Sequence, residues 1–224
     1  MKKRMHQIEL FLKYPHDVQA DWLWRLINSA QNTEWGRKYD YKSINSREEF
    51  KNRVPVQTYE TIKPYIDRMM RGEQNILWNS EINWFSKSSG TTADKSKFIP
   101  VSEEALEECH YKGGKDMLSF YCNNYPEAEI FTGKSLSMGG SLRVNEFNNE
   151  TKHGDISAII IRNLPNWVEV LRTPNIEVAL MEEWEEKIEK MAKVTAKENV
   201  TSISGVPSWT LVLLKRILEI TGKK

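Results

Sequence analysis

Residues Phe85 to Pro100 read FSKSSGTTADKSKFIP, and the interpretation of the whole chain starts from this stretch. Its middle packs five small residues, SSGTT at 88–92, between an apolar run and a lysine-containing segment. Glycine, serine and threonine supply backbone N–H groups and hydroxyls that can surround an anion, and a lysine adds positive charge. The same composition is typical of a solvated turn between a strand and a helix. Composition alone leaves both interpretations open.

The overall composition indicates a folded globular protein without a general affinity for polyanions. The chain has 224 residues, of which 39% are hydrophobic and eight are tryptophan, which is enough apolar surface for a sizeable core. Its 32 Lys and Arg against 31 Asp and Glu give a formal net charge of +1. This balance argues against a nucleic-acid or anionic-membrane partner, so any anion site must be local.

The cysteines and the N-terminus predict a cytoplasmic protein without a metal site. Cys109 and Cys122 lack the spacing of zinc ligands, and two cysteines do not make a disulfide scaffold. The first apolar residues are interrupted by Gln7, Glu9 and Lys13, unlike the core of a signal peptide. No segment approaches the roughly 20 apolar residues that span a bilayer.

The first 75 residues have the pattern of a helical layer. Apolar residues recur at steps of three to four from Met5 to about Ala30, and Pro15 divides this stretch into two helices. The segment SREE at 46–49 is a capping-box pattern that opens a short helix. A further helical stripe, stopped at Gly72, consists of Tyr59, Ile62, Tyr65, Ile66 and Met69.

After residue 75 the pattern changes to strands alternating with helices. Short apolar segments at 75–78 and 82–85 favour strands, and Ser102 can cap a helix that runs to about Asn123. The later expected elements are strands at 134–138, 142–144, 158–161 and 199–203, a charged helix at about 177–198 and a last helix at 209–220 that Gly222 ends. Such alternation predicts an α/β fold with a mixed sheet flanked by helices.

One charged run resembles a pair of catalytic carboxylates. Glu182, Glu183, Glu185 and Glu186 are followed at helical spacing by Lys187, Lys190 and Lys193. Acidic residues followed by lysines one turn later form ion pairs on exposed helices. The run therefore predicts a solvated helix face.

Several further motifs accompany the quoted loop. The loop fits the pattern SSGTT-x-x-x-x-K-x-x-P, and the other segments, in order, are TEWGR at 33–37, VPVQTY at 54–59, PYI at 64–66, GE at 72–73 with IL at 76–77, and SGVPSW at 204–209. Together they resemble the acyl acid amido synthetases, the Gretchen Hagen family first known as auxin-responsive plant proteins. This family belongs to the adenylate-forming enzymes. The resemblance covers essentially the whole chain, but only the N-terminal portion of a family member.

The resemblance implies ATP, with Mg²⁺ carried by it, as the cofactor of a two-step ligase reaction. The acid forms an acyl-adenylate, and an amino acid then displaces AMP to give an amide. The residues that would hold the β- and γ-phosphates are Ser88, Ser89, Gly90, Thr91, Thr92 and Lys97. The turn with Val206 and Ser208 would border the acid pocket, with plain core packing as its alternative. No residue is assigned to catalysis or to a metal.

The same resemblance implies a fold and a domain organisation. Residues 1–75 would be an N-terminal helical layer and residues 76–224 an α/β part that carries the phosphate loop. Together they would form one incomplete adenylation domain, similar to the first half of the large domain of adenylate-forming enzymes.

Elements that such an enzyme needs are absent from residues 1–224. They are a Y-x-S-S-E-type segment for adenine and magnesium, an aspartate for the ribose, and a C-terminal domain. We therefore expect the N-terminal part of an amido synthetase, inactive as the isolated 224 residues, whose full-length form acts on a small carboxylic acid and an amino acid. The alternatives are an acyl-CoA ligase of the same superfamily and a non-catalytic binding module that retains the fold.

Overall fold

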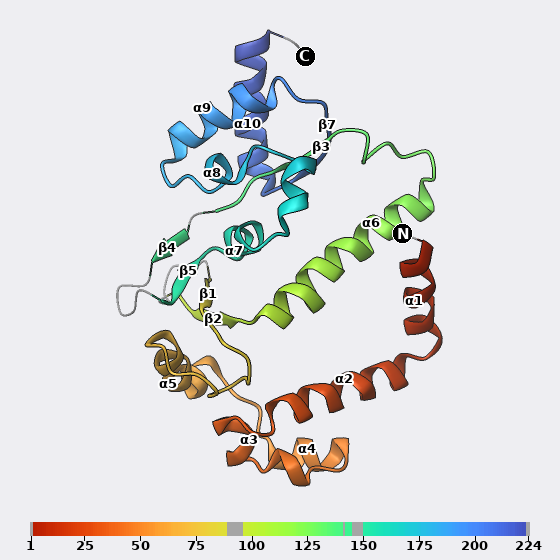
Figure 1. The fold of residues 1–224 in the computed structure, drawn as a ribbon, viewed down its shortest axis with the longest axis vertical. Coiled ribbons are helices and arrows are strands. Elements are labelled where there is room, and N and C mark those ends of the chain that lie inside the picture. Colours follow the sequence, from red (N-terminus) through yellow and green to blue (C-terminus); the bar gives the residue numbers. More distant parts are fainter. Residues whose placement is uncertain (1, 89–95, 141, 145–149, 223–224) are drawn as a thin grey trace. The chain divides into compact units, whose positions relative to one another are not determined.

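The computed structural model describes residues 2–88, 96–140, 142–144 and 150–222. The chain folds into two compact units, and Figure 1 shows their elements. Unit 1 contains Met1–Pro126 and Val144–Lys152, and unit 2 contains Glu127–Arg143 and His153–Lys224. Each unit has its own apolar core.

Unit 1 begins with the expected helical layer. Its first elements are α1 (Lys2–Lys13), α2 (Pro15–Ala30), α3 (Glu34–Lys38), the 3₁₀ helix η1 (Tyr41–Ser43), α4 (Arg47–Arg53) and α5 (Tyr59–Met70). Pro15 opens α2, as predicted. Ser46 caps α4, because its hydroxyl accepts the Glu49 N–H at 3.1 Å. Gly72, with φ of 98°, follows the end of α5.

The predicted strand at 75–78 is wrong. The carbonyl groups of Asn75 and Ile76 accept the Glu34 and Trp35 N–H groups at 3.0 Å each. These carbonyls therefore accept hydrogen bonds from the free N–H groups in the first turn of α3, and they do not take part in a strand ladder. Ile76 is nevertheless buried, in a core with Ile66, Met69, Met70, Ile82 and Phe85. The apolar pattern indicated burial correctly but not the type of element.

The quoted loop connects two antiparallel strands. They are β1 (Trp84–Lys87) and β2 (Phe98–Val101), with Lys87 opposite Phe98. The expected order of one strand, loop and helix is wrong because it missed β2. Pro100 has no N–H to donate to a strand ladder, so the sequence at β2 does not indicate a strand. Proline is nevertheless tolerated on edge strands. Two more strands, β4 (Leu142–Val144) and β5 (Lys152–Gly154), lie where the chain passes between the units.

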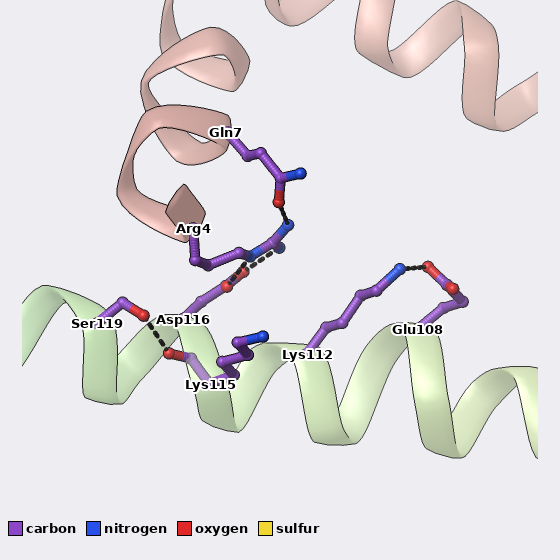
Figure 2. A network of polar contacts seen from close by, with 7 residues as sticks. All are labelled: Arg4, Gln7, Glu108, Lys112, Lys115, Asp116 and Ser119. Atoms are coloured by element: carbon purple, nitrogen blue, oxygen red, sulfur yellow. Dashed lines mark hydrogen bonds and ion pairs between the residues drawn. The ribbon is translucent and has the colours of Figure 1, made fainter. Parts of the chain in front are cut away.

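A long helical segment follows β2. It begins as a π-helix, η2 (Ala105–Tyr111), and continues as α6 (Lys112–Asn124). Ser102 caps it as predicted, with its hydroxyl 3.1 Å from the Ala105 N–H nitrogen. Figure 2 shows how α1 is attached to α6: the Arg4 guanidinium makes two hydrogen bonds to the Asp116 carboxylate, one of them at 2.7 Å. Arg4 lowers the pKa of the Asp116 carboxyl.

Unit 2 is a small α/β unit. Its elements are β3 (Lys134–Ser137), α7 (Ile156–Arg162), η3 (Asn166–Leu171), β6 (Arg172–Thr173), α8 (Ile176–Ala179), α9 (Trp184–Thr195), β7 (Val200–Ser204) and α10 (Pro207–Thr221). The three strands form a parallel sheet in the order β6-β3-β7. Helices α9 and α10 lie side by side (Figure 1). Their buried side chains form a core with β3 that includes Leu136, Met138, Ile188, Met191 and Leu213.

Two predictions for unit 2 are wrong. Residues 158–161 belong to helix α7 and not to a strand, because a short continuous apolar run suits either buried element. The expected helix at 177–198 is split into two helices, α8 and α9. The split lets α8 fold back and pack against α9, which one continuous helix could not do. The strands at 134–138, 142–144 and 199–203 and the last helix, ended by Gly222 with φ of 64°, are confirmed. The chain therefore has the expected mixed α/β fold.

Candidate functional site

Two of the predicted phosphate-binding residues close the β1–β2 hairpin. The Ser88 N–H donates to the Lys97 carbonyl at 2.8 Å, and the Lys97 N–H donates to the Ser88 hydroxyl at 3.0 Å. These bonds bring the two ends of the loop together. The other four predicted residues, Ser89, Gly90, Thr91 and Thr92, lie outside the described residues.

The Lys97 ammonium stands over an aromatic ring. Its Nζ lies 5.5 Å from the centroid of Tyr59, a residue of α5. The Tyr59 hydroxyl accepts the Phe98 N–H at 2.9 Å, so the same ring also holds β2. Within the described part of the chain, Lys97 forms no ion pair with a carboxylate. Tyr59 was not among the predicted site residues, although it ends the VPVQTY motif.

The parallel sheet of unit 2 has an edge suited to a ligand. From β3 the chain goes to β6 on one side and then returns to β7 on the other. Ligands of open α/β sheets bind outside the carboxyl ends of the strands where the strand order reverses in this way. In unit 2 this point lies between the ends of β3 and β7, where Ser137 is opposite Ser204.

Val206 and Ser208 lie at this edge, in the turn from β7 to α10. Val206 precedes the helix and is 45% exposed, Pro207 is its first residue, and Ser208 is exposed. A helix N-terminus offers free N–H groups and a partial positive charge to an anion. Both side chains are therefore accessible in this structure. They belong to unit 2, whereas Ser88 and Lys97 belong to unit 1.

Lys187 lies at the same edge and is buried, so its predicted place on a solvated helix face is wrong. Lys190 and Lys193 lie on a solvated face as predicted, in ion pairs with Glu186 and Glu189 at 2.7 and 2.9 Å. Lys187, however, is 3% exposed. Its position was readable from spacing, because it shares the buried face of α9 with Ile188, Met191, Ala192 and Thr195.

Unit 1 also contains a groove of about 660 Å³ between α1, α2 and the η2–α6 helix. Leu10, Phe11, Val18 and Trp22 line its apolar part. Charged residues also line it, and Figure 2 shows two pairs of them, Arg4 with Asp116 and Lys112 with Glu108.

Neither a metal cluster nor a membrane helix is found in the described ranges. Their His, Cys, Asp and Glu side chains form no group of three or more that could hold a metal ion. No helix among the residues that the structure describes has the length and apolar character needed to cross a membrane.

Comparison with known proteins gives consistent matches. The model of the GH3 family N-terminal domain matches residues 4–224. Indole-3-acetic acid-amido synthetase GH3.2 of Arabidopsis thaliana is 37% identical over 106 residues, which are 47% of this chain and 19% of the relative. Jasmonoyl--L-amino acid synthetase JAR4 of Nicotiana attenuata is 31% identical over 104 residues, 46% of this chain and 18% of the relative.

A solved structure supports the same fold. AtGH3.15 acyl acid amido synthetase in complex with 2,4-DB aligns with a TM-score of 0.77 and 21% identity, over 98% of this chain and 38% of that chain. The chain thus spans well under half of the solved relative, and its alignments span about a fifth of the curated ones. Because the family model covers nearly every residue, the chain belongs to the GH3 family and corresponds to its N-terminal domain.

Proposed function

We propose that this chain is the N-terminal part of an ATP-dependent acyl acid amido synthetase and carries its phosphate loop. The observation that carries the proposal is the closed hairpin base at Ser88 and Lys97, with a lysine charge that no described carboxylate neutralises. Membership of the GH3 family supports it, since the curated relatives are named as indole-3-acetic acid and jasmonoyl amido synthetases.

In the proposed reaction a carboxylate oxygen of the acid attacks the α-phosphorus of ATP, and pyrophosphate leaves. The amine of an amino acid then attacks the acyl carbon, forms the amide bond and releases AMP. The chain's own contribution is electrostatic: Lys97 compensates phosphate charge, and SSGTT at 88–92 supplies N–H and hydroxyl donors. Magnesium would arrive with ATP and neutralise further phosphate charge. No described residue is assigned to it.

We further propose that the acid binds at the carboxyl edge of the unit 2 sheet. Val206 would contact the apolar body of the acid, and Ser208 would donate to its carboxylate. The N-terminus of α10 supports this assignment because it favours a negative charge.

Residues 1–75 and 76–224 would together form one incomplete adenylation domain. The isolated 224 residues would bind substrates without turning them over, because the adenine, ribose and C-terminal elements lie elsewhere in the relatives. A cytoplasmic location is supported by Cys109 and Cys122, both free thiols.

Pyrophosphate exchange with a panel of acids tests the proposal. The panel contains indole-3-acetate, jasmonate and 2,4-DB, with calorimetry of Mg·ATP in parallel. We expect saturable ATP binding and little exchange by the isolated chain. Rapid exchange would contradict the expected inactivity, and absence of ATP binding would contradict the phosphate loop. If products form, an amide with amino acids favours the synthetase, whereas a thioester with coenzyme A favours the acyl-CoA ligase.

A further inference from the structure

Lys187 occupies a core position near the start of α9. Its side chain is 3% exposed, and its neighbours Ile188 and Met191 are 7% and 0% exposed. Lysines are almost never fully buried unless they are paired. Burial lowers the pKa of the Lys187 ammonium, and the negative charge of Asp155 partly opposes this effect. An apolar residue would fill the position without the free-energy cost of removing an ammonium from water, so core packing does not explain the lysine.

The hydrogen bonds of Lys187 explain its presence. Nζ donates to the Gly139 carbonyl at 2.5 Å and to the Gly140 carbonyl at 3.2 Å. Both glycines are buried and lie just past the end of β3. The Met138 N–H still bonds to the Ser204 carbonyl at 3.2 Å. Buried carbonyls beyond the sheet need donors of their own, and Lys187 supplies them.

The same turn is fixed from its other sides. The Gly140 N–H donates to the Ser157 hydroxyl at 3.0 Å. A Cβ added at Gly139 would lie 2.7 Å from Ile161 Cδ1, and one added at Gly140 would lie 1.9 Å from Asp155 Oδ2. The main chain of this turn is therefore held in one place by α7 and α9.

We propose that Lys187 is a positioning residue for the acid-binding edge: its ammonium fixes the Gly139–Gly140 main chain beside the turn that carries Val206 and Ser208. The inference rests on the proposed function, which assigns the acid to this edge. The two turns are neighbours because β3 and β7 are paired up to Ser137 and Ser204. A misplacement of about 1 Å in a substrate site can lower the reaction rate about a hundredfold.

Calorimetric titration of the full 224-residue chain with 2,4-DB and indole-3-acetate tests the assignment. The test variant is Lys187→Met, and the matched control is Lys190→Met, which removes an exposed ammonium from the same helix. We expect Lys187→Met to weaken acid binding on the order of tenfold to a hundredfold. The control should stay within about twofold of the wild type, and Mg·ATP binding should be unchanged in both variants. Equal acid affinities of the two folded variants would overturn the inference.

Two further measurements separate this inference from the proposed function. Hydrogen exchange at 136–140 should be faster in Lys187→Met than in Lys190→Met, and equal exchange would overturn the inference. If the wild type binds no acid, the proposed acid site fails, and the exchange result alone decides whether Lys187 holds the turn. If Lys187→Met does not fold, Lys187→Ala with added propylammonium replaces it. Restoration of slow exchange by the amine, and not by propanol, is then the expected result, and equal effects of the two additives would overturn the inference.

Discussion

Gly140 and Gly113 differ in what surrounds them, although both interrupt regular patterns in the sequence. A Cβ at Gly140 would lie 1.9 Å from Asp155 Oδ2 and 2.6 Å from Asp155 Cβ, whereas a Cβ at Gly113 would meet nothing within 4 Å. We expect Gly140→Ala to lower the free energy of unfolding by about 1–3 kcal/mol. Gly113→Ala, inside a helix, should raise it by about 0.4–1 kcal/mol. Urea denaturation of both variants checks this, and shifts of the same sign would contradict it.

Tyr59 provides a second test at the scale of single residues. Its hydroxyl accepts the Phe98 N–H, so Tyr59→Phe should leave this donor without a partner and cost about 1 kcal/mol of unfolding free energy. Tyr65 is a control on the same helix, because its hydroxyl accepts from the exposed Lys38 ammonium and from no other donor that the described residues provide. Tyr65→Phe should therefore be nearly neutral. Equal destabilisation of the two variants in urea would contradict the role of Tyr59.

The ion pair between α1 and α6 gives a prediction at the scale of elements. Arg4 lowers the pKa of Asp116 below its unfolded value of about 3.9, so the pair stabilises the fold above that pH. This contribution is lost as the pH falls through the lowered pKa. Asp116→Asn should cost about 1 kcal/mol at pH 7, since the pair is partly exposed. The difference from the wild type should stay constant above pH 5 and shrink below about pH 4 in acid-dependent urea denaturation. A difference that grows on acidification would contradict the ion pair.

Element boundaries were predictable where local chemistry determines them. Pro15, Ser46, Ser102 and Gly222 each mark a helix end through a missing N–H, a capping hydroxyl or a positive φ, and the structure has each end as predicted. The predicted type of element was wrong where contacts with residues far along the chain determine whether a segment is a strand, a helix or a loop. The 75–78 segment gives its carbonyls to α3, and nothing local distinguishes this from a strand.

Each unit has its own apolar core, so we expect a core substitution to destabilise only the unit that contains it. Leu213 is 0% exposed in the unit 2 core, and Ile66 is 2% exposed in the unit 1 core. Leu213→Ala and Ile66→Ala should each cost about 2–5 kcal/mol in their own unit. Hydrogen exchange should accelerate in residues of the mutated unit only. Equal acceleration in both units would show that they unfold as one.

The candidate site was predictable only in part, for a physical reason. The loop ends at Ser88 and Lys97 belong to a contiguous motif, so its pattern was readable in the sequence. Lys187 and Gly139 are 48 residues apart, and only the packing of α9 on β3 brings them together. The charge of Lys187 suggested solvent, whereas its spacing indicated the core. The spacing was the more reliable signal, because the period of a helix determines which residues face inward.

Calorimetric binding of Mg·ATP to this chain tests whether the β1–β2 hairpin carries a phosphate loop. Wild type, Lys97→Met and the control Lys87→Met, an exposed lysine at the other strand of the hairpin, are compared. We expect saturable binding that Lys97→Met weakens about tenfold to a hundredfold, because a lysine–phosphate hydrogen bond contributes about 1.5–3 kcal/mol. Lys87→Met should bind like the wild type. No saturable binding, or equal affinities for Lys97→Met and the wild type, would contradict the assignment of this hairpin as a phosphate loop.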